Sequence, residues 1–379
     1  MRFRRVRRFN GERFNFAHTD RGWTVQFGVD YVLMYDMVVG SEWLTGLIGV
    51  QSHLEESLLS SSANCETRTG STDRRYSHFG GRHITGVSGL DGSDLYTVRT
   101  GGTTERTIAR TINHLAMRLD DDDVAAEDIN FDAPLPPGTS FYDALSITPT
   151  LSGDYLIVGI GAVRCGTASK DIESQLLVNG SAVGFCSTRL RDTNERRPWG
   201  GFTKVTGLSG AQAFQTQVKS VDGVTGVSFD QSLIQCVRLD TLRDYQYDEE
   251  LGLGQDNTGV YVPRASVTVN GPGEYWVLAS AQLARNVAAA AFVKGRVRVG
   301  ADVVHEVSVD PPTLYEETLF YSGRHIINSS TTCILEWATG VAPRNANIRN
   351  ATIVAMNLTP IHRLINKGTK QLRGTIQLR

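Results

Sequence analysis

The stretch Ile147-Thr-Pro-Thr-Leu-Ser-Gly-Asp-Tyr-Leu-Ile-Val-Gly-Ile-Gly-Ala-Val163 decides the fold of this chain. It predicts a strand, a tight turn at Ser152-Gly153-Asp154 and a second, strongly apolar strand. Related phrases run over residues 23–39 and 267–283, and each phrase has an acid followed by a tyrosine, at Asp30-Tyr31, Asp154-Tyr155 and Glu274-Tyr275. These tyrosines recur about every 120 residues, so the repeat has the size of a domain.

Two further markers keep the same order and spacing. A Gly-Gly pair stands at 80–81 and 200–201, and the phrase at 323–326 echoes 81–84. An apolar phrase closes each unit, over residues 112–119, 233–239 and 353–358. The chain is therefore predicted to consist of three tandem units.

Composition and turn signals indicate β-structure in every unit. Glycine is frequent at 38 residues, and no segment keeps a helical period over a useful length. Asn179-Gly180 lies between two alternating runs and predicts a hairpin with a type I′ turn, and Gly300 marks the corresponding turn in the third unit. The predicted fold class is all-β, with three tandem antiparallel β-sandwich (jelly-roll-like) domains and extended basic terminal arms.

The boundaries follow from the markers and from the polar segments between them. The predicted segments are a basic arm over 1–20, sandwich units over 21–119, 140–239 and 262–358, acidic linkers over 120–139 and 240–261, and a basic tail over 359–379. The acidic linkers lack the ligand spacing of a calcium loop, so solvated linkers are the main interpretation and a metal site the alternative.

Charge separates the two ends of the chain from its body. The net charge is −2, yet residues 1–13 carry six arginines against one glutamate, and residues 359–379 carry five basic residues. We expect the N-terminal arm to dock on a partner through charge-assisted pairs and apolar contacts. The residues assigned to this docking are Arg2, Phe3, Arg4, Arg5, Arg7, Arg8 and Phe9.

The sequence lacks recognisable motifs of catalysis, metal binding and membrane insertion. The five cysteines form no Cys-x-x-Cys pair, and no two histidines have metal-ligand spacing. The sequence has no phosphate-binding glycine loop and no nucleophile elbow. No apolar run approaches the length of a membrane span, and none follows the first arginines as in a secretory signal. We therefore expect no enzyme activity, no cofactor, no metal and no membrane partner.

The order of strand, turn, Gly-acid-Tyr, apolar strand, Asn-Gly hairpin and closing strand resembles the jelly-roll domains of the complement globular-head and tumour-necrosis-factor superfamily. The resemblance is to the versions found in bacteriophage and viral structural proteins. It covers most of residues 146–239 and 266–358, and the first unit more loosely, because that unit lacks a clear Asn-Gly hairpin. The resemblance implies trimeric assembly and structural or binding roles.

This resemblance, with the missing catalytic motifs, suggests a non-enzymatic structural protein of a virion. The expected role is a bacteriophage capsid-decorating, head-fibre or tail-associated protein, made in the host cytoplasm and bound to capsid, portal or tail proteins. The alternative is a tail-fibre module that binds a receptor or a host-surface glycan, with Trp199 as the sugar contact. A third hypothesis is an intracellular enzyme with a β-sandwich accessory region. Nucleic acid is a less favoured partner of the basic arm.

The tyrosine strand of the second unit is apolar on both faces, so both faces need cover. We expect Tyr155, Ile157, Gly159 and Gly161 to lie at a subunit interface, where the glycines let strands approach closely. Two arrangements provide that cover. Three chains can form a homotrimer, which the weaker divergence of the tyrosine strands favours, or the three units of one chain can pack together as a pseudo-trimer.

Overall fold

The computed structural model describes residues 138–358 apart from gaps at 166–169, 191–195, 210, 223–226, 243, 257, 286–291, 310–315 and 343–344. Before residue 138 it describes the strands given below. The predicted basic tail over 359–379 lies outside the described residues. All regular elements of the described residues are strands, which confirms the predicted all-β fold class.

The strands form three units in chain order. Unit 1 contains β1 (Phe3–Arg4), β2 (Glu12–Phe14), β3 (Ala17–Thr19), β4 (Tyr31–Ser41), β5 (Gly49–Leu54), β6 (Ser57–Ser60), β7 (Arg75–Ile84), β8 (Leu95–Thr100) and β9 (Thr107–Arg118). Unit 2 contains β10 (Val124–Ile129), β11 (Ala133–Pro134), β12 (Tyr142–Ile147), β13 (Gly153–Cys165), β14 (Lys170–Val178), β15 (Ser181–Leu190), β16 (Arg196–Leu208), β17 (Phe214–Ser220) and β18 (Val227–Arg238). Unit 3 contains β19 (Tyr245–Glu250), β20 (Gly254–Asp256), β21 (Val262–Val269), β22 (Gly273–Arg285), β23 (Val293–Val299), β24 (Asp302–Val309), β25 (Glu316–Ile327), β26 (Thr331–Thr339) and β27 (Ala346–Asn357).

Each unit has the strand order of a jelly roll. In unit 2 an inner sheet has the order β10-β18-β13-β16 and an outer sheet has the order β12-β17-β14-β15. The same orders recur as β1-β9-β4-β7 with β3-β8-β5-β6 in unit 1, and as β19-β27-β22-β25 with β21-β26-β23-β24 in unit 3. Two four-stranded antiparallel sheets with these crossings are the double-sheet jelly roll. In all three units the tyrosine strand is central in the inner sheet, between the closing strand and the Gly-Gly strand.

The arm and the linkers supply the first strand of each jelly roll. Phe3 in β1 pairs with Met117, Val124 in β10 with Val237, and Tyr245 in β19 with Met356. On each closing strand, this partner lies one residue before the residue that pairs with the unit's tyrosine. The first strand therefore pairs in the same register in all three units. Nine residues later, β2, β11 and β20 resume pairing on the same closing strands. The repeat thus begins at Phe3, and the segments predicted as an arm and solvated linkers contain edge strands.

The hairpin signals are confirmed. Asn179 and Gly180 have φ angles of 48° and 77°, the pair of positive values that a type I′ turn requires. Gly300, with φ of 62°, makes the corresponding turn between β23 and β24. Both turns fix the register of the outer-sheet hairpin, so the same face of each hairpin points into its sandwich.

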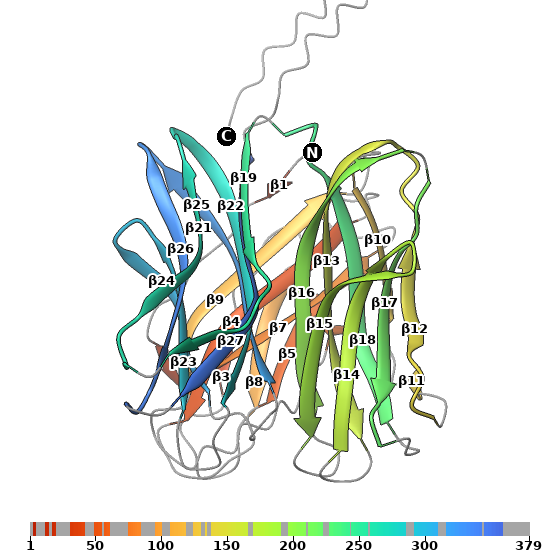
Figure 1. Cartoon of the computed structure of the whole chain (residues 1–379), viewed down its shortest axis with the longest axis horizontal. Coiled ribbons are helices and arrows are strands. Elements are labelled where there is room, and N and C mark those ends of the chain that lie inside the picture. Colours follow the sequence, from red (N-terminus) through yellow and green to blue (C-terminus); the bar gives the residue numbers. More distant parts are fainter. Residues whose placement is uncertain are drawn as a thin grey trace, which may run out of the picture.

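The tyrosine strands of units 2 and 3 are covered on both faces within one chain. Tyr155 and Ile157 lie in the core of the unit 2 sandwich, together with Phe214 of β17 and Ile234 of β18. The alternate residues of β13 lie in a central core formed by the inner sheets of all three units. The members of this core on the tyrosine strands are Met34, Leu156, Val158, Ile160, Trp276 and Leu278. In Figure 1 the orange strands of unit 1 lie between the yellow-green strands of unit 2 and the blue strands of unit 3.

This arrangement overturns the reason given for a homotrimer. The cover that β13 needs comes from units 1 and 3 of the same chain, as in the predicted pseudo-trimer. The face assigned to an interface is also the wrong one, because Tyr155 and Ile157 face their own sandwich. A side chain at Gly159 would collide with Leu176 of the outer sheet, at 2.3 Å, so this glycine permits packing inside unit 2. A side chain at Gly161 would collide with Ser232 of unit 2, at 2.5 Å.

The junctions between units repeat as well. Strand β7 of unit 1 lies beside β24 of unit 3, and β25 of unit 3 lies beside β15 of unit 2. In both cases the last strand of one inner sheet meets the last strand of the neighbour's outer sheet. The described residues therefore include two equivalent junctions of a pseudo-threefold arrangement, the 3/1 junction and the 2/3 junction.

We predict that deleting residues 1–14 destabilises unit 1. The deletion removes the pairings of β1 and β2 with β9, which extend over five residues. With about 0.5–1.5 kcal/mol for each backbone hydrogen bond, the expected loss is about 3 kcal/mol of the free energy of unfolding, measured by urea denaturation. The control keeps the chain length and replaces Arg5 and Arg7 by serine. An unchanged urea midpoint in the deleted protein would show that β1 and β2 contribute nothing to the fold.

A second prediction concerns Asp256 at the end of β20. Its carboxylate accepts hydrogen bonds from the backbone N–H groups of Thr258, Gly259 and Thr339 at 3.1, 3.4 and 2.9 Å, and from the Thr258 hydroxyl at 2.7 Å. Burial alone would raise the pKa of Asp256, but these hydrogen bonds to the ionised form outweigh burial and lower it. The stabilisation is therefore present above the unfolded pKa of about 4 and is lost as the pH falls through the lower folded pKa. Asp256→Ala should cost about 1–2 kcal/mol at neutral pH, and the difference from the parent protein should shrink below about pH 4 in urea titrations. A difference that stays constant down to pH 2 would contradict this.

Candidate functional site

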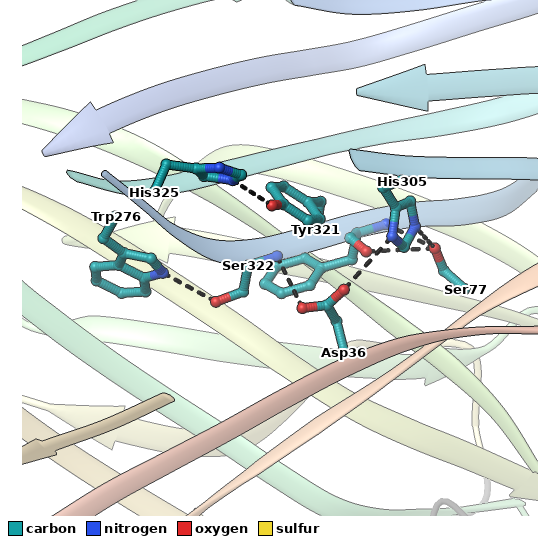
Figure 2. Close-up of polar contacts among 8 residues, drawn as sticks. Asp36, Ser77, Trp276, His305, Tyr321, Ser322 and His325 are labelled. Atoms are coloured by element: carbon teal, nitrogen blue, oxygen red, sulfur yellow. Dashed lines mark hydrogen bonds and ion pairs between the residues drawn. The ribbon is translucent and has the colours of Figure 1, made fainter. Parts of the chain in front are cut away.

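The 3/1 junction contains a group of buried polar side chains. Asp36 of β4 and Ser77 of β7 come from unit 1, and His305 of β24 comes from unit 3 (Figure 2). Their exposed fractions are 0%, 4% and 1%. We call these three residues the clasp, because they join strands from two different jelly rolls.

His305 is held between the other two members. Its Nε2 atom lies 2.7 Å from the Ser77 hydroxyl, and its Nδ1 atom lies 3.5 Å from Asp36 Oδ2. The other carboxylate oxygen of Asp36 accepts a hydrogen bond from the backbone N–H of Ser322, at 3.1 Å. The backbone N–H of Phe320 donates to the Ser77 hydroxyl at 3.3 Å. Both unit 1 side chains are therefore bonded to the main chain of β25 in unit 3.

Aromatic and polar contacts surround the clasp. The Phe79 ring stacks on Phe320 with centroids 4.7 Å apart. The Trp276 indole N–H donates to the Ser322 hydroxyl at 2.9 Å, as Figure 2 shows. At the rim of the junction, β7 pairs with β24 through Arg75 and Ser308, and Arg75 lies 3.4 Å from the Glu306 carboxylate. The clasp is thus enclosed by apolar rings and closed at its edge by an ion pair.

Serine, histidine and aspartate in this order are the components of an acyl-transfer triad. The 3.5 Å between His305 and Asp36 is longer than the hydrogen bond that orients such a histidine. Ser77 is only 4% exposed, and a nucleophile must reach its substrate. The arrangement therefore supports attachment of unit 1 to unit 3 rather than catalysis.

The 2/3 junction uses a different set of polar contacts. Arg197 of β16 forms a buried ion pair with Glu317 of β25. Gln282 of β22 donates through Nε2 to the Gly200 carbonyl at 3.2 Å, and the Thr318 hydroxyl donates to Gln282 Oε1 at 2.9 Å. Buried ion pairs and hydrogen bonds of this kind fix one relative placement of two packed surfaces more than they add stability.

The residues predicted as sites fall into three places. Phe3 and Arg4 form β1 against β9, and the remaining docking residues of the arm lie outside the described residues. Tyr155, Ile157, Gly159 and Gly161 lie inside unit 2, as described above. Trp199 is 2% exposed, because it packs inside unit 2 near Gly161, and it presents no ring face to solvent. The predicted sugar contact requires an exposed aromatic ring, and the Trp199 ring is buried.

Sequence analysis missed the clasp. Asp36 was the available signal, because it interrupts the otherwise apolar run from Tyr31 to Val39. A buried acid in a core strand needs a partner, but that partner, His305, lies 269 residues further along the chain. Nothing in the local sequence of either residue points to the other.

In the described part of the chain, no group of three or more His, Cys, Asp or Glu side chains could hold a metal ion. The cysteines Cys236 and Cys333 are buried, and burial raises the pKa of the Cys333 thiol to about 12. Within the same residues, no helix is long and apolar enough to span a membrane.

Comparisons with known proteins return only distant likenesses. No protein-family model matches the chain, and no curated protein matches it. A structure of infectious bursal disease virus, Gt strain, is similar at 9% identity over 97% of this chain and 84% of that chain, with a TM-score of 0.24. A structure of PNGF-II is similar at 6% identity over 86% and 98%, with a TM-score of 0.29. A triple jelly roll that forms a turret in an archaeal virus is similar at 8% identity over 92% and 82%, with a TM-score of 0.19. At these scores the likenesses carry no argument about this chain.

We predict that the clasp contributes strongly to the 3/1 junction. His305→Ala leaves a cavity in the buried junction and removes the ring that contacts Asp36 and Ser77, which should cost about 2–5 kcal/mol of the free energy of unfolding. Adding Asp36→Asn in that background should restore part of the loss, because the buried charge is then gone. Urea denaturation of the single and double variants measures both effects.

His325→Ala is the matched control. This half-buried histidine of unit 3 bonds to the Tyr321 hydroxyl at 2.6 Å and lies outside the clasp, so its loss should cost only about 1 kcal/mol. Equal losses for His305→Ala and His325→Ala would contradict a special role of the clasp.

Proposed function

We propose that the chain is a non-enzymatic structural protein of a virus particle, in which three fused jelly rolls act as one rigid block. The observation that carries the proposal is the central core, to which the inner sheets of all three units contribute. Double-sheet jelly rolls are the building elements of many viral shells, although lectins and cupins use them too. A block of three jelly rolls with matching strand orders suits a position of local threefold symmetry in a larger assembly.

The design of the block supports a structural role over a catalytic one. The clasp and the Arg197–Glu317 pair place their polar groups in dry junctions, where they fix the units relative to one another. Polar groups of the unit 2 outer sheet pair with each other, for example Lys219 with Glu173, and Gln175 with Gln217 at 2.5 Å. These contacts rigidify the block and assemble no reactive centre among the described residues.

The finer proposal is that the chain decorates a bacteriophage capsid, or forms part of its head fibre or tail, through its basic ends. The arginines of the first eight residues stand next to β1 in the sequence, so docking and the first strand share one segment. Docking would use charge-assisted pairs with carboxylates of a capsid, portal or tail protein.

The test separates docking from folding. In the virus that encodes the chain, Arg2, Arg5, Arg7 and Arg8 are replaced by serine, which removes four positive charges and no strand. We expect the parent protein to be found in purified particles by mass spectrometry and the variant to be lost from them, with unchanged melting of the isolated protein. Absence of the parent protein from the particles would refute a virion role. Normal incorporation of the variant would refute docking through the arm.

A further inference from the structure

A cleft opens at the 2/3 junction, between β14, β15 and β16 of unit 2 and β22 and β27 of unit 3. The cleft is narrow and partly open to solvent, and the residues that line it are largely buried. Leu176, Trp199 and Phe202 line its unit 2 side, and Ser280, Gln282 and Thr352 line its unit 3 side. None of the residues around the cleft carries a formal charge.

The cleft is the pseudo-symmetric counterpart of the clasp. Strands β12 and β21 share a burial pattern and a bulge at the same place, which aligns Tyr142 with Val262. The strand pairing then aligns Leu176 with Val297. Their hairpin partners, Gly184 and His305, are therefore equivalent too. Glycine therefore stands in unit 2 where unit 3 has the histidine of the clasp.

The inner sheets give the same result. The tyrosine strands align Asp36 with Ser280, since both lie five residues after the tyrosine. Their pairing aligns Phe320 of unit 3 with Gly200 of unit 2. At the 3/1 junction an imidazole and a phenyl ring stand at these two positions, and at the 2/3 junction both positions are glycine, of which Gly184 has free space beside it.

The open space accepts new atoms at defined points. A Cβ added at Gly184 would lie 3.8 Å from Leu176, and one added at Gly201 would lie 3.9 Å from the Ser280 hydroxyl, which are ordinary contacts. A Cβ at Gly200 would lie 2.8 Å from Phe79 of unit 1, so the phenyl part of the space is already taken. What is missing at this junction is a group the size of the His305 ring.

Polar groups at the cleft define the chemistry of an occupant. The hydroxyls of Ser280 and Thr352 lie 2.8 Å apart, and since one donates to the other, the pair keeps one donor for a ligand. The Gln282 amide is held in place by Gly200 and Thr318. With apolar side chains opposite and no charge to compensate a charged ligand, the cleft favours a neutral group with one polar edge.

We infer that this cleft binds a small neutral ring compound with a hydrogen-bonding edge, of imidazole or phenol size. The ring takes the place that His305 has in the clasp, and its polar edge faces Ser280 and Gln282. The inference rests on the comparison of the two junctions and is independent of the proposed virion role.

The experiment uses the full chain and follows the indole N–H signal of Trp199 by NMR, assigned with Trp199→Phe. Phenol, and imidazole at about pH 8.5 where its ring is mostly neutral, are titrated separately. We expect a saturable shift of the Trp199 signal with both compounds and none with benzoate, a ring of similar size that carries a charge. Absence of a saturable shift with phenol and imidazole would overturn the inference.

Two variants close the cleft and one serves as control. Gly184→His places the histidine of the clasp in the cleft and should abolish the shift, and Gly201→Ala, a smaller change, should weaken it. Ala182→His puts the same side chain at an exposed position of β15 and should leave the shift intact. If the shift persists in both cleft variants, the ring binds elsewhere and the inference is wrong.

Discussion

The structure depends on the central core in which three inner sheets bury their second face. A strand such as β13 is apolar on both sides, and one side alone is satisfied by its own sandwich. The other side requires two more sheets, and these are present in the same chain. The block is therefore one cooperative body, since no unit could leave without exposing Leu156 and its counterparts to water.

The polar contacts complete this core at its edges. The clasp joins units 1 and 3 through a buried aspartate and histidine, whereas the 2/3 junction relies on Arg197, Glu317 and a held glutamine. Apolar packing is tolerant of small shifts, and a bonded polar group is not. These contacts explain how three similar sheets can meet in one defined arrangement.

Sequence reasoning could predict the parts of the fold that leave a hydrophobic pattern. The tyrosine, Gly-Gly and closing strands were visible because their sequences are strongly apolar, and in units 2 and 3 these strands are buried. The first strands were missed for the opposite reason. An edge strand such as β19 is only half-buried, and the acidic end of its run Tyr-Gln-Tyr-Asp-Glu-Glu is typical of a linker. The apolar character of both faces of β13 was read correctly, yet nothing local says which face meets its own outer sheet. That assignment depends on the register with β17 and β14, which is a property of the whole sandwich. The clasp could not be predicted from the sequence, because its members belong to different units.

The fusion of three jelly rolls into one chain has a consequence for how such a protein can change. In an assembly of identical subunits a substitution appears at every junction at once, so a histidine that suits one contact is imposed on all of them. Here the residues of each junction stand at different positions of one chain, so they can differ from one junction to the next. One junction has an aspartate and a histidine, and the equivalent place in another has serine and glycine. Because the three units are linked in one chain, a substitution at one junction leaves the others unchanged. A nearly symmetric protein can therefore have different side chains at each junction.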